Sequence, residues 1–391
     1  MKFTDEQLRF IESDAKRLIL DAPAGTGKTE TIAERVRRSV EAGKNVLLTC
    51  FTHSSRKTLQ KRLNEAGLSH ITVRTVGSLA HELLVEEYGN IFLVGDGSDI
   101  AREVCSGTAV RPKNLTQFEA LTVNGAPLPD SLPPITASVY EEYEKKKEEI
   151  GYLSHLDVIL AATGMRDYGY DEIYIDEAQD LAPIQWRMLL SFGGKKYIFA
   201  GDPGQAIYGF SGVDVELLPR LIADGWEKIS LTRSFRVPSA LLPVVNLNRE
   251  TPMSSIRDGG SVQLIEEDYR KLPETLSMML KKGDAVLSWN QNALSKIIGY
   301  MKIYRAGVPM TFSWNEKELK DDAVHFSTIH SAKGGEWNRV FLVGLEEDGF
   351  SSHWEKVEAE QKRLFYVGAT RAKDELVLCQ TGEELPWGLK L

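Results

Sequence analysis

The sequence has few cysteines, no long apolar run and no excess of positive charge. Only three cysteines occur among its 391 residues, Cys50, Cys105 and Cys379, far apart and without a CxxC pair. This spacing argues against a disulfide framework or a zinc site and is typical of a reducing compartment. No run of 18 apolar residues is present, and the first ten residues, MKFTDEQLRF, lack an apolar core. We therefore expect no membrane span, no signal peptide and a cytoplasmic location.

The charge balance is acidic, with 47 Lys and Arg against 56 Asp and Glu, a formal net charge of −9. This excludes a histone-like coat of nucleic acid but leaves local basic stripes open. The length predicts two or three domains, and a composition of 42% hydrophobic and 26% charged residues is typical of a globular protein. The chain has no low-complexity tract and no short-period repeat.

The most informative stretch is Leu18 to Thr31, LILDAPAGTGKTET. Its apolar start predicts a short buried strand, and the residues from Glu30 to Ser39 predict a helix. Glycines between a strand and a helix let successive backbone N–H groups point at an anion, as a phosphate-binding loop requires. Lys28 would reach the β- and γ-phosphates, and the hydroxyl of Thr29 would ligate Mg²⁺. Ala22 stands where the usual GxxxxGK[ST] pattern has its first glycine, so a chance match is the alternative.

Strands and helices alternate on both sides of this loop. Further buried strands are predicted at 45–50, 72–75, 172–176, 196–201 and 228–231, and in the second half at 262–265, 285–288, 324–327, 340–343 and 375–378. This alternation predicts parallel, doubly wound α/β sheets. After Thr72 to Thr75 we expect a helix beginning at Leu79. From about 86 to 165 the pattern loosens, as in a small inserted subdomain.

Three further side chains allow more than one interpretation. Asp176 and Glu177 follow a buried strand, which suits an Mg²⁺-linked Asp and a Glu that activates water; acids at a helix N-terminus are the alternative. Gln7 closes a capping box with Thr4, and it could instead bind both edges of adenine.

Taken in chain order, these segments resemble the motifs of superfamily 1 DNA helicases of the UvrD/Rep/PcrA type. The matching segments are Gln7, APAGTGKT (22–29), CFTHSS (50–55), DEAQD (176–180), GDPGQAIYGFSG (201–212), LTRSFR (231–236), VHFSTIHSAKGGEW (324–337) and EQKRLFYVGATRAK (360–373). The resemblance implies two RecA-like P-loop domains that bind ATP in the cleft between them.

The resemblance also implies roles for individual residues in binding and cleaving ATP. Catalytic roles fall to Lys28, Asp176, Glu177, Gln205, Arg236 and Arg371, the last two as arginine fingers. ATP contacts fall to Gln7, Ala22, Gly25, Thr26, Gly27, Lys28, Thr29, Phe235 and Glu336, and Mg²⁺ contacts to Thr29 and Asp176. Phe235 would stack on adenine, Glu336 would meet the ribose and Gln205 would sense the γ-phosphate.

A track for a nucleic-acid strand is implied in the same way. Phe51, Tyr208 and Phe210 match base-stacking positions, and Thr52, Ser78, Thr328 and His330 match positions that contact the backbone. Core packing is the alternative for Tyr208 and Phe210, and a structural hydrogen bond is the alternative for His330. The expected partners are single-stranded DNA and tailed duplex DNA, and we expect a monomer.

The chain departs from the family pattern in several places. Val76-Gly77 replaces the usual Phe-His before Ser78, Gly335 replaces a Leu, and Glu30 stands where some relatives have Arg. Only 85 residues, 239–323, separate the fourth and fifth motifs, so the family's large second insertion is missing or reduced to a loop near 315–322. We predict a first RecA-like domain at 1–85 and 166–230, an inserted subdomain at 86–165 and a second RecA-like domain at 231–391.

The function expected from the resemblance is an ATP-dependent, 3′ to 5′ single-stranded DNA translocase and helicase. The alternative is a nucleic-acid-stimulated ATPase switch that controls a partner without unwinding, as the reduced insertions and acidic charge would suit. An RNA-directed relative is a third interpretation, because no residue decides between DNA and RNA.

Overall fold

The computed structural model describes residues 2–89, 92–126, 128, 132, 134–135, 137–247, 249, 251–289, 291–304, 309–313, 322–345 and 358–381. The chain divides into two compact units. The first unit comprises residues 1–21 and 28–231, and the second comprises residues 22–27 and 232–391. The predicted loop near 315–322 lies almost wholly outside the described residues.

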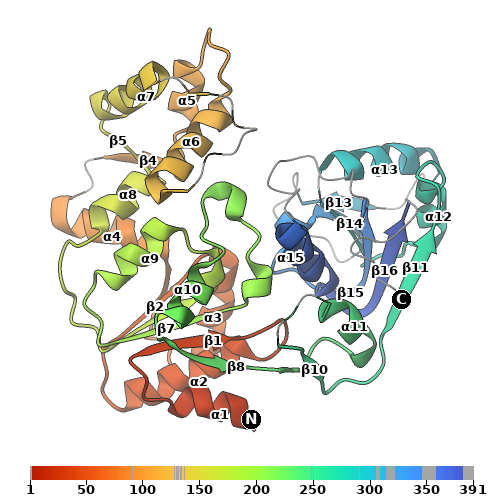
Figure 1. Cartoon of the computed structure of the whole chain (residues 1–391), viewed down its shortest axis with the longest axis horizontal. Helices are drawn as coiled ribbons and strands as arrows, with labels where there is room; N and C mark the ends of the chain where they lie inside the picture. The colour runs from red at the N-terminus through yellow and green to blue at the C-terminus, as the bar shows by residue number, and fades with distance from the viewer. Residues whose placement is uncertain are drawn as a thin grey trace. The chain divides into compact units, whose positions relative to one another are not determined.

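The first unit is built on a parallel sheet of six strands (Figure 1). In spatial order the strands are β3 (Val73–Thr75), β2 (Val46–Cys50), β6 (Glu172–Asp176), β7 (Lys196–Gly201), β1 (Arg17–Asp21) and β8 (Glu227–Ser230). The inner strands β1, β6 and β7 are almost wholly buried, which is why their sequences run apolar without alternation. Since all six run parallel, their carboxyl ends meet at one edge, where doubly wound sheets bind ligands.

Helices on both faces bury this sheet. They are α1 (Asp5–Glu12), α2 (Lys28–Glu41), α3 (His53–Glu65), α4 (Val76–Tyr88), α8 (His155–Ala162), α9 (Pro183–Leu190) and α10 (Leu217–Ala223), with the 3₁₀ turns η1 (Ala178–Asp180), η2 (Pro203–Gln205) and η3 (Gly209–Ser211). The helix predicted from Leu79 begins at Val76, because the side chain of Thr75 accepts a hydrogen bond from the Ser78 N–H and caps the helix three residues earlier.

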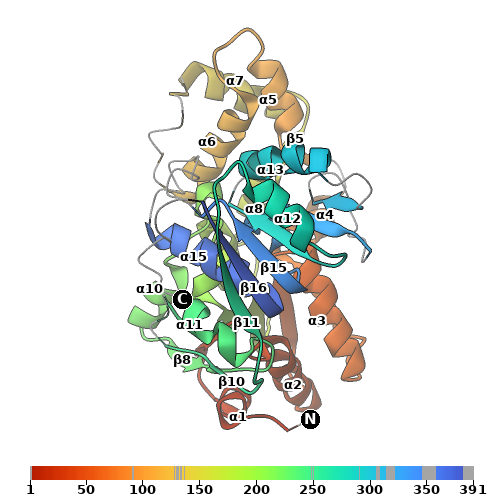
Figure 2. The same cartoon turned by 90° about the vertical axis from the view of Figure 1, so that its right-hand side faces the viewer.

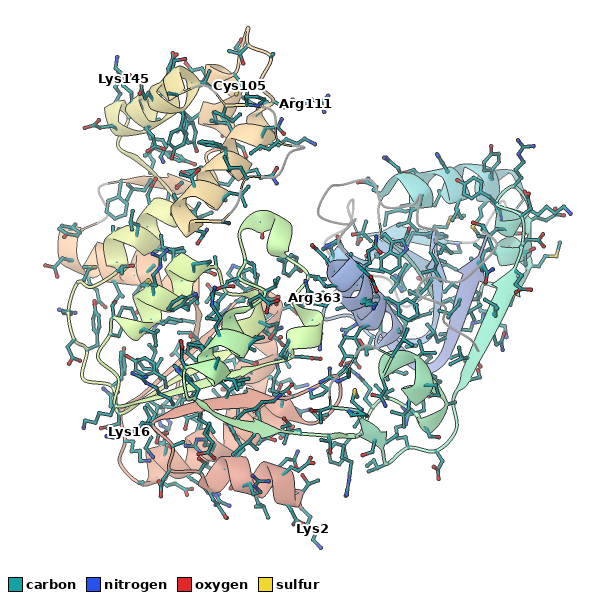
Figure 3. The ribbon with its side chains drawn as sticks, in the orientation of Figure 1. Lys2, Lys16, Cys105, Arg111, Lys145 and Arg363 are labelled. Atoms are coloured by element: carbon teal, nitrogen blue, oxygen red, sulfur yellow. The ribbon has the colours of Figure 1, made fainter. Side chains whose placement is uncertain are left out.

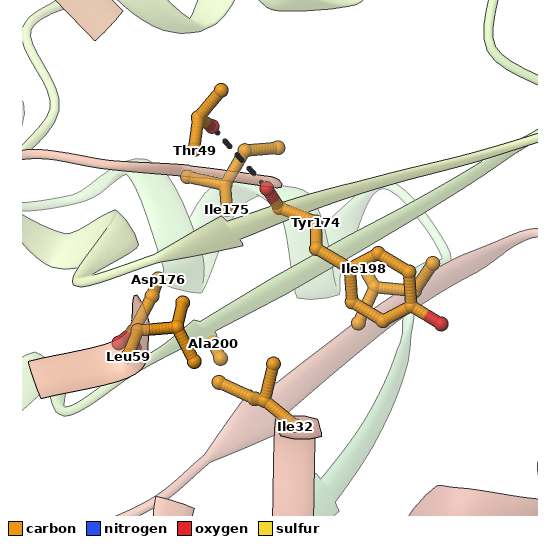
Figure 4. Close-up of a pocket in the computed structure, with 8 residues that line it drawn as sticks. All are labelled: Ile32, Thr49, Leu59, Tyr174, Ile175, Asp176, Ile198 and Ala200. Carbon is orange, nitrogen blue, oxygen red and sulfur yellow. Dashed lines mark hydrogen bonds between the residues drawn. The ribbon is translucent and has the colours of Figure 1, made fainter. Parts of the chain in front are cut away.

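The contact between α2, α3 and the sheet is dry. Ile32 of α2 and Leu59 of α3 line a small void with Tyr174 of β6 and Ile198 of β7 (Figure 4). The void leaves no room for a water molecule. The hydroxyl of Thr49, which also lines the void, donates to the Tyr174 carbonyl at 3.2 Å, so this polar group has a hydrogen-bond partner. The face of the sheet beneath α2 is therefore packed core, and its functional groups lie at the strand ends.

A small, mostly helical segment is inserted between β3 and β6. It contains β4 (Leu93–Gly95), α5 (Ser98–Val104), α6 (Pro112–Asn124), α7 (Ala137–Glu149) and β5 (Tyr152–Ser154). It has its own apolar cluster, which includes Ile100, Leu115, Tyr143 and Cys105, the residue after α5 that Figure 3 labels. All three cysteines of the chain are free and buried.

The second unit has a parallel sheet of six strands (Figure 2). In spatial order they are β11 (Ser261–Glu266), β16 (Ala372–Gln380), β15 (Trp337–Val343), β12 (Ala285–Ser288), β14 (Val324–Thr328) and β13 (Met310–Phe312). The other described elements of this unit are β9 (Arg233–Ser234), β10 (Ser254–Ser255), η4 (Ser239–Leu241), α11 (Leu242–Val245), α12 (Leu272–Met279), α13 (Gln291–Tyr304), α14 (Ile329–Ala332) and α15 (Glu358–Ala369).

The predicted fold class is confirmed, since both sheets are parallel and connected by helices. Each of the ten strands predicted beyond the glycine loop overlaps an observed strand. Among the described residues, no helix has the combination of length and apolar character that crossing a bilayer demands.

Candidate functional site

The glycine loop, residues 22–27, connects the carboxyl end of β1 to the first residue of α2, Lys28. Gly25 and Gly27 have φ angles of 75° and 82°, in the left-handed region that favours glycine. The hydroxyl of Thr26 donates to the carbonyl of Pro23 at 2.8 Å, which closes the turn from inside. The loop therefore has the strand–turn–helix setting that phosphate binding requires.

By its contacts, this loop groups with the second unit. The Ser234 hydroxyl donates to the Ala24 carbonyl at 3.0 Å, and the Phe235 N–H donates to the Gly25 carbonyl at 2.8 Å. A Cβ at position 25 would lie 2.5 Å from the Cβ of Arg236. Only glycine fits at this close approach, whatever its φ angle.

A cluster of charged side chains joins the start of α2 to the end of β6. The ammonium of Lys28 lies 2.8 Å from Asp176 Oδ1 and 2.6 Å from Glu177 Oε1. Lys28 and Asp176 are 13% and 4% exposed. The ammonium of Lys28, at the start of α2, thus lies between two adjacent carboxylates at the end of β6 and holds the loop-helix junction against that strand end.

The ionisation of this cluster follows from its burial and its charges. Burial opposes the charge on Lys28, but the carboxylates of Asp176 and Glu177 outweigh it and raise the pKa of Lys28. Burial raises the pKa of Asp176, Lys28 opposes that shift and Glu177 adds to it. Two carboxylates this close gain from any further cation placed beside them, as a divalent metal would be.

Glu177 stands in an unusual backbone conformation. Its φ angle is 56°, and among the described residues it is the only non-glycine residue with a positive φ. The N–H of Glu177 donates to Asp176 Oδ1 at 2.9 Å, and Gln179 Nε2 donates to Glu177 Oε2 at 2.6 Å. This local strain turns the Glu177 carboxylate to Lys28 on one side and to Gln179 on the other.

Gln179 connects two strand ends. Its Oε1 accepts the N–H of Asp202 at 3.1 Å, just beyond β7, while its Nε2 binds Glu177. It is 2% exposed, so these bonds are made away from water. Asp202 in turn accepts from Gln205 Nε2 at 2.8 Å. A continuous set of hydrogen bonds thus runs from Lys28 through Glu177 and Gln179 to Gln205.

Gln7 makes the capping box predicted from the sequence. Its Oε1 accepts the Thr4 N–H at 2.9 Å, and its own N–H donates to the Thr4 hydroxyl at 3.3 Å. The far end of α1 is held by Arg35 of α2, whose guanidinium donates to the carbonyls of Phe10, Ile11 and Ser13. Gln7 therefore has the capping role predicted from the sequence, and its contact with adenine stays a prediction.

Other predicted nucleotide contacts sit at the start of α2. Thr29, the second residue of the helix, is partly buried. Ala22 is 2% exposed directly after β1. Glu30 pairs with Arg62 Nε at 2.9 Å, so the residue that replaces an Arg of some relatives is engaged with the basic helix α3.

In the second unit, Arg236 forms an ion pair with Glu336, which also lies 3.9 Å from Lys373 Nζ. Arg371 is 3% exposed and donates to the Val367 carbonyl at 2.9 Å and to the Thr370 hydroxyl at 3.0 Å. The structure brings Arg236 and Glu336 together and fixes the orientation of Arg371. Phe235 is 40% exposed, so its ring is accessible for stacking.

The predicted residues that contact a nucleic-acid strand lie at or after the carboxyl ends of β-strands. Phe51 and Tyr208 are neighbours, with ring centroids 6.0 Å apart. Burial and the nearby acids Asp180 and Glu177 raise the pKa of Tyr208 to about 12. The side chain of Phe210 lies outside the described residues.

The polar members of this set begin helices. Thr52 caps α3, Thr328 caps α14, and Ser78 stands in the first turn of α4 with its N–H bonded to Thr75. Ser78 is exposed, and Thr52, Thr328 and His330 are partly buried. Each hydroxyl therefore has a structural role in addition to the predicted contact.

Sequence reasoning missed two features of this site. Gln179 was included in the DEAQD segment without a role of its own, although a glutamine between buried acids is a signal. Gly335 was seen only as a departure; a Cβ there would overlap the Trp337 ring, with Cζ3 at 2.9 Å, so the aromatic residue two positions on requires it.

Comparisons with known proteins cover both halves of the chain. The family described as "AAA domain" matches residues 7–211, and the family described as "UvrD-like helicase C-terminal domain" matches residues 292–383. The first match contains the glycine loop, DEAQD and Gln205, and the second contains Thr328, Glu336 and Arg371.

Individual relatives agree with these families. DNA helicase II of Escherichia coli is 25% identical over 62% of this chain and 39% of its own length. ATP-dependent DNA helicase Rep of E. coli is 27% identical over 45% of this chain and 27% of its own. RecBCD enzyme subunit RecB of Mycolicibacterium smegmatis is 27% identical over 59% of this chain and 23% of its own length. The chain thus spans less than half the length of these curated relatives. With both family matches and the parallel α/β fold, the chain belongs to the UvrD-like superfamily 1 helicases.

Proposed function

We propose that this chain hydrolyses Mg-ATP and uses the energy to move 3′ to 5′ along single-stranded DNA and to separate tailed duplexes. The observation that carries the proposal is the cluster of Lys28, Asp176 and Glu177 at the start of α2 and the end of β6, connected through Gln179 to Gln205. Its relatives are named DNA helicases, which supports DNA as the polymer.

The residues present fit Mg-ATP. Positive φ at Gly25 and Gly27 lets loop N–H groups turn toward an anion, and Lys28 keeps its charge because two carboxylates raise its pKa. Thr29 and Asp176 offer the hydroxyl and carboxylate oxygens that Mg²⁺ prefers, and we assign them to the metal. Bound Mg²⁺ would neutralise charge on the phosphates as it develops.

Glu177 is the residue we assign to the attacking water. One of its oxygens is held by Lys28 and the other by Gln179, so the carboxylate has a fixed position from which to accept a proton. When the phosphates draw Lys28 away from the carboxylates, Glu177 loses a cation partner and becomes a stronger base. The γ-phosphate is sensed by Gln205, whose amide reports through Asp202 and Gln179 to Glu177.

The second unit supplies the remaining groups. We assign Arg236 and Arg371 to charge on the transferring phosphoryl group, Glu336 to the ribose, and Phe235, with Gln7, to adenine. In the structure described here Arg236 is neutralised by Glu336. ATP binding would therefore exchange the Glu336 carboxylate for phosphate oxygens, which links nucleotide binding to a change in the second unit.

DNA would lie along the aromatic residues that follow β2 and β7. The neighbouring rings of Phe51 and Tyr208 offer flat apolar faces at these strand ends, and base stacking on such rings contributes about 1–3 kcal/mol per base without sequence preference. We place Phe210 in the same track, and assign Thr52, Ser78, Thr328 and His330 to the sugar-phosphate backbone. Because Tyr208 follows Gln205 by three residues, nucleotide sensing and strand contact share one short segment.

The test is ATP hydrolysis with and without single-stranded DNA, paired with strand displacement on 3′-tailed and 5′-tailed duplexes. We expect stimulation by DNA, loss of both activities in Lys28→Ala and unwinding of the 3′-tailed substrate. The absence of DNA stimulation, or full hydrolysis in Lys28→Ala, would contradict the proposal. DNA-stimulated hydrolysis without strand displacement on either duplex would favour the ATPase switch that controls a partner. Stronger stimulation by RNA than by DNA would indicate that RNA is the substrate.

A further inference from the structure

A segment outside all of the helicase motifs runs beside the Arg236 segment in the second unit. The Ser254 N–H donates to the Thr232 carbonyl at 2.8 Å and the Ile256 N–H to the Ser234 carbonyl at 3.1 Å. In the reverse direction, the Ser239 N–H donates to the Arg257 carbonyl at 2.8 Å. The two segments are thus bonded on both sides of Arg236.

The side chain of Arg257 extends from this segment to a third part of the chain. Its Nη1 donates to the Arg236 carbonyl at 2.6 Å and to the Lys373 carbonyl at 3.0 Å. Its Nη2 donates to Asp374 Oδ1 at 2.6 Å. One planar guanidinium therefore connects the backbone of Arg236 to the start of β16, two residues after Arg371.

From this geometry we propose that Arg257 is a positioning residue that holds the segments carrying Arg236 and Arg371 in a fixed relative placement. The inference rests on the proposed function, in which both arginines act on the transferring phosphoryl group. The guanidinium of Arg371 is already oriented by Val367 and Thr370. Arg371 Nη1 also donates to the Gly335 carbonyl at 3.3 Å, beside the Glu336 that pairs with Arg236. The side chain of Arg257 adds a connection between the backbones of the two segments, and this connection sets where Arg371 stands relative to Arg236.

The bonds to carbonyl groups carry this role, and the ion pair contributes little to it. Arg257 and Asp374 are 38% and 47% exposed, and exposed ion pairs contribute about 0–1 kcal/mol. The rigid fork of an arginine presents its donors on separate nitrogens in fixed directions, whereas a lysine ammonium offers its three donors on one freely rotating atom. Close packing agrees with this: a Cβ at Gly260 would lie 2.5 Å from Pro238 Cγ and 2.9 Å from the Asp374 carbonyl.

The second unit offers a matched control. Arg339 of β15 donates to Asp284 at 2.5 and 3.1 Å and to the Met279 carbonyl at 2.8 Å. It makes the same kinds of hydrogen bond as Arg257, but to Asp284 and Met279, which lie on segments that carry none of the proposed catalytic residues. Its contact with β16 is a long ion pair, 3.9 Å from Nη1 to Glu375 Oε2. At 15% exposed, Arg339 is also more buried than Arg257, so its loss should destabilise the fold at least as much.

The experiment compares Arg257→Gln, Arg339→Gln and Asp374→Asn in the full chain. The measurements are kcat and KM for ATP with saturating single-stranded DNA, the equilibrium affinity for ADP with aluminium fluoride, and thermal unfolding. For Arg257→Gln we expect kcat to fall roughly 10- to 100-fold with KM within about threefold, because misplaced groups weaken the transition state more than the ground state. Affinity for the transition-state mimic should fall in parallel, whereas Arg339→Gln and Asp374→Asn should keep wild-type kcat per folded molecule.

Wild-type kcat and mimic affinity in Arg257→Gln overturn the inference, and so does an equal loss in Arg339→Gln, which would mark a general effect of stability. If Arg257→Gln does not fold, Arg257→Lys is measured in its place. The lysine ammonium reaches the carbonyls but lacks the planar fork, so we expect a smaller fall in kcat. An unchanged kcat in Arg257→Lys overturns the inference. The variant Arg371→Ala distinguishes a failure of the proposed arginine roles in hydrolysis from a failure of the positioning role of Arg257. Undiminished hydrolysis in Arg371→Ala would mean that the proposed role of the arginines fails; a loss in Arg371→Ala with none in Arg257→Gln refutes the positioning role alone.

Discussion

Replacing Gly201 by alanine tests the link between Gln179 and the two strand ends it joins. Gly201 ends β7, and its backbone is not in the left-handed region, so alanine adds no strain of its own. The new Cβ would overlap Gln179 Oε1 and lie 3.2 Å from the Gln179 backbone nitrogen. Since Gln179 is buried and bonded at both ends, its amide has to leave its position.

The magnitude follows from the bonds that this movement breaks. The Asp202 N–H loses its bond to Gln179, and leaving a buried donor unsatisfied is worth about 1–3 kcal/mol. For a unit of this size, about 2 kcal/mol corresponds to a fall in Tm of roughly 4–8 °C. Glu177 keeps its bond to Lys28 but loses the second support of its carboxylate. We expect kcat to fall by up to about 100-fold while KM for ATP changes little.

The assay is steady-state ATP hydrolysis with saturating single-stranded DNA, together with thermal unfolding of the same preparations. Gly299→Ala is the matched control, because Gly299 lies within α13 and a Cβ there meets nothing within 4 Å. That control should gain about 1 kcal/mol of stability and keep its activity. A wild-type kcat in Gly201→Ala, despite a lower Tm, would refute the positioning of Glu177 through Gln179.

Other substitutions test the remaining assignments. Glu177→Gln should keep ATP affinity and lose turnover by about 10²- to 10⁴-fold, as single-turnover hydrolysis would measure, and persistent turnover would make the base assignment wrong. Arg371→Ala should lower kcat by about 10³-fold or more with a smaller loss of ATP affinity by titration. Tyr208→Ala should weaken binding of single-stranded DNA by about 1–3 kcal/mol in fluorescence anisotropy while basal hydrolysis stays near normal, and unfolding instead would indicate core packing. Because an unfolded tyrosine ionises near pH 10 and Tyr208 near 12, this group should lower stability as the pH rises between those values, and Tyr208→Phe should remove that contribution in pH-dependent unfolding.

The sequence was most informative where chemistry and periodicity coincide. Buried parallel strands such as 172–176 and 196–201 are short apolar runs that end in Asp or Gly, and they were predicted to within a residue or two. The strands β4 and β5 were missed, because they lie outside the two large sheets and form only where Leu93–Gly95 meets Tyr152–Ser154 in the folded chain.

Within the site, the sequence predicted which residues carry the chemistry, but it did not predict which residues hydrogen-bond to one another. Lys28, Asp176 and Glu177 were identified from their motifs, and the structure places the Lys28 ammonium 2.8 Å from Asp176 and 2.6 Å from Glu177. The roles of Gln179 and Arg257 depend on bonds between segments far apart in sequence, which no local pattern encodes. The roles assigned to the predicted site residues in ATP and DNA binding stay predictions until the variants above are measured.

The order of strands in the first sheet has a consequence for synthesis of the chain. β1, the strand that precedes the glycine loop, lies between β7 and β8. Its residue Arg17 pairs with Tyr197 and its residue Leu18 with Glu227, so both of its neighbouring strands are synthesised long after it. The nascent polypeptide must therefore emerge almost to the end of the first unit before this strand is paired, while the inserted helices, whose contacts are local, can fold earlier. A ribosome-stalled product ending before Tyr197 should leave residues 17–21 open to proteolysis and to chaperones.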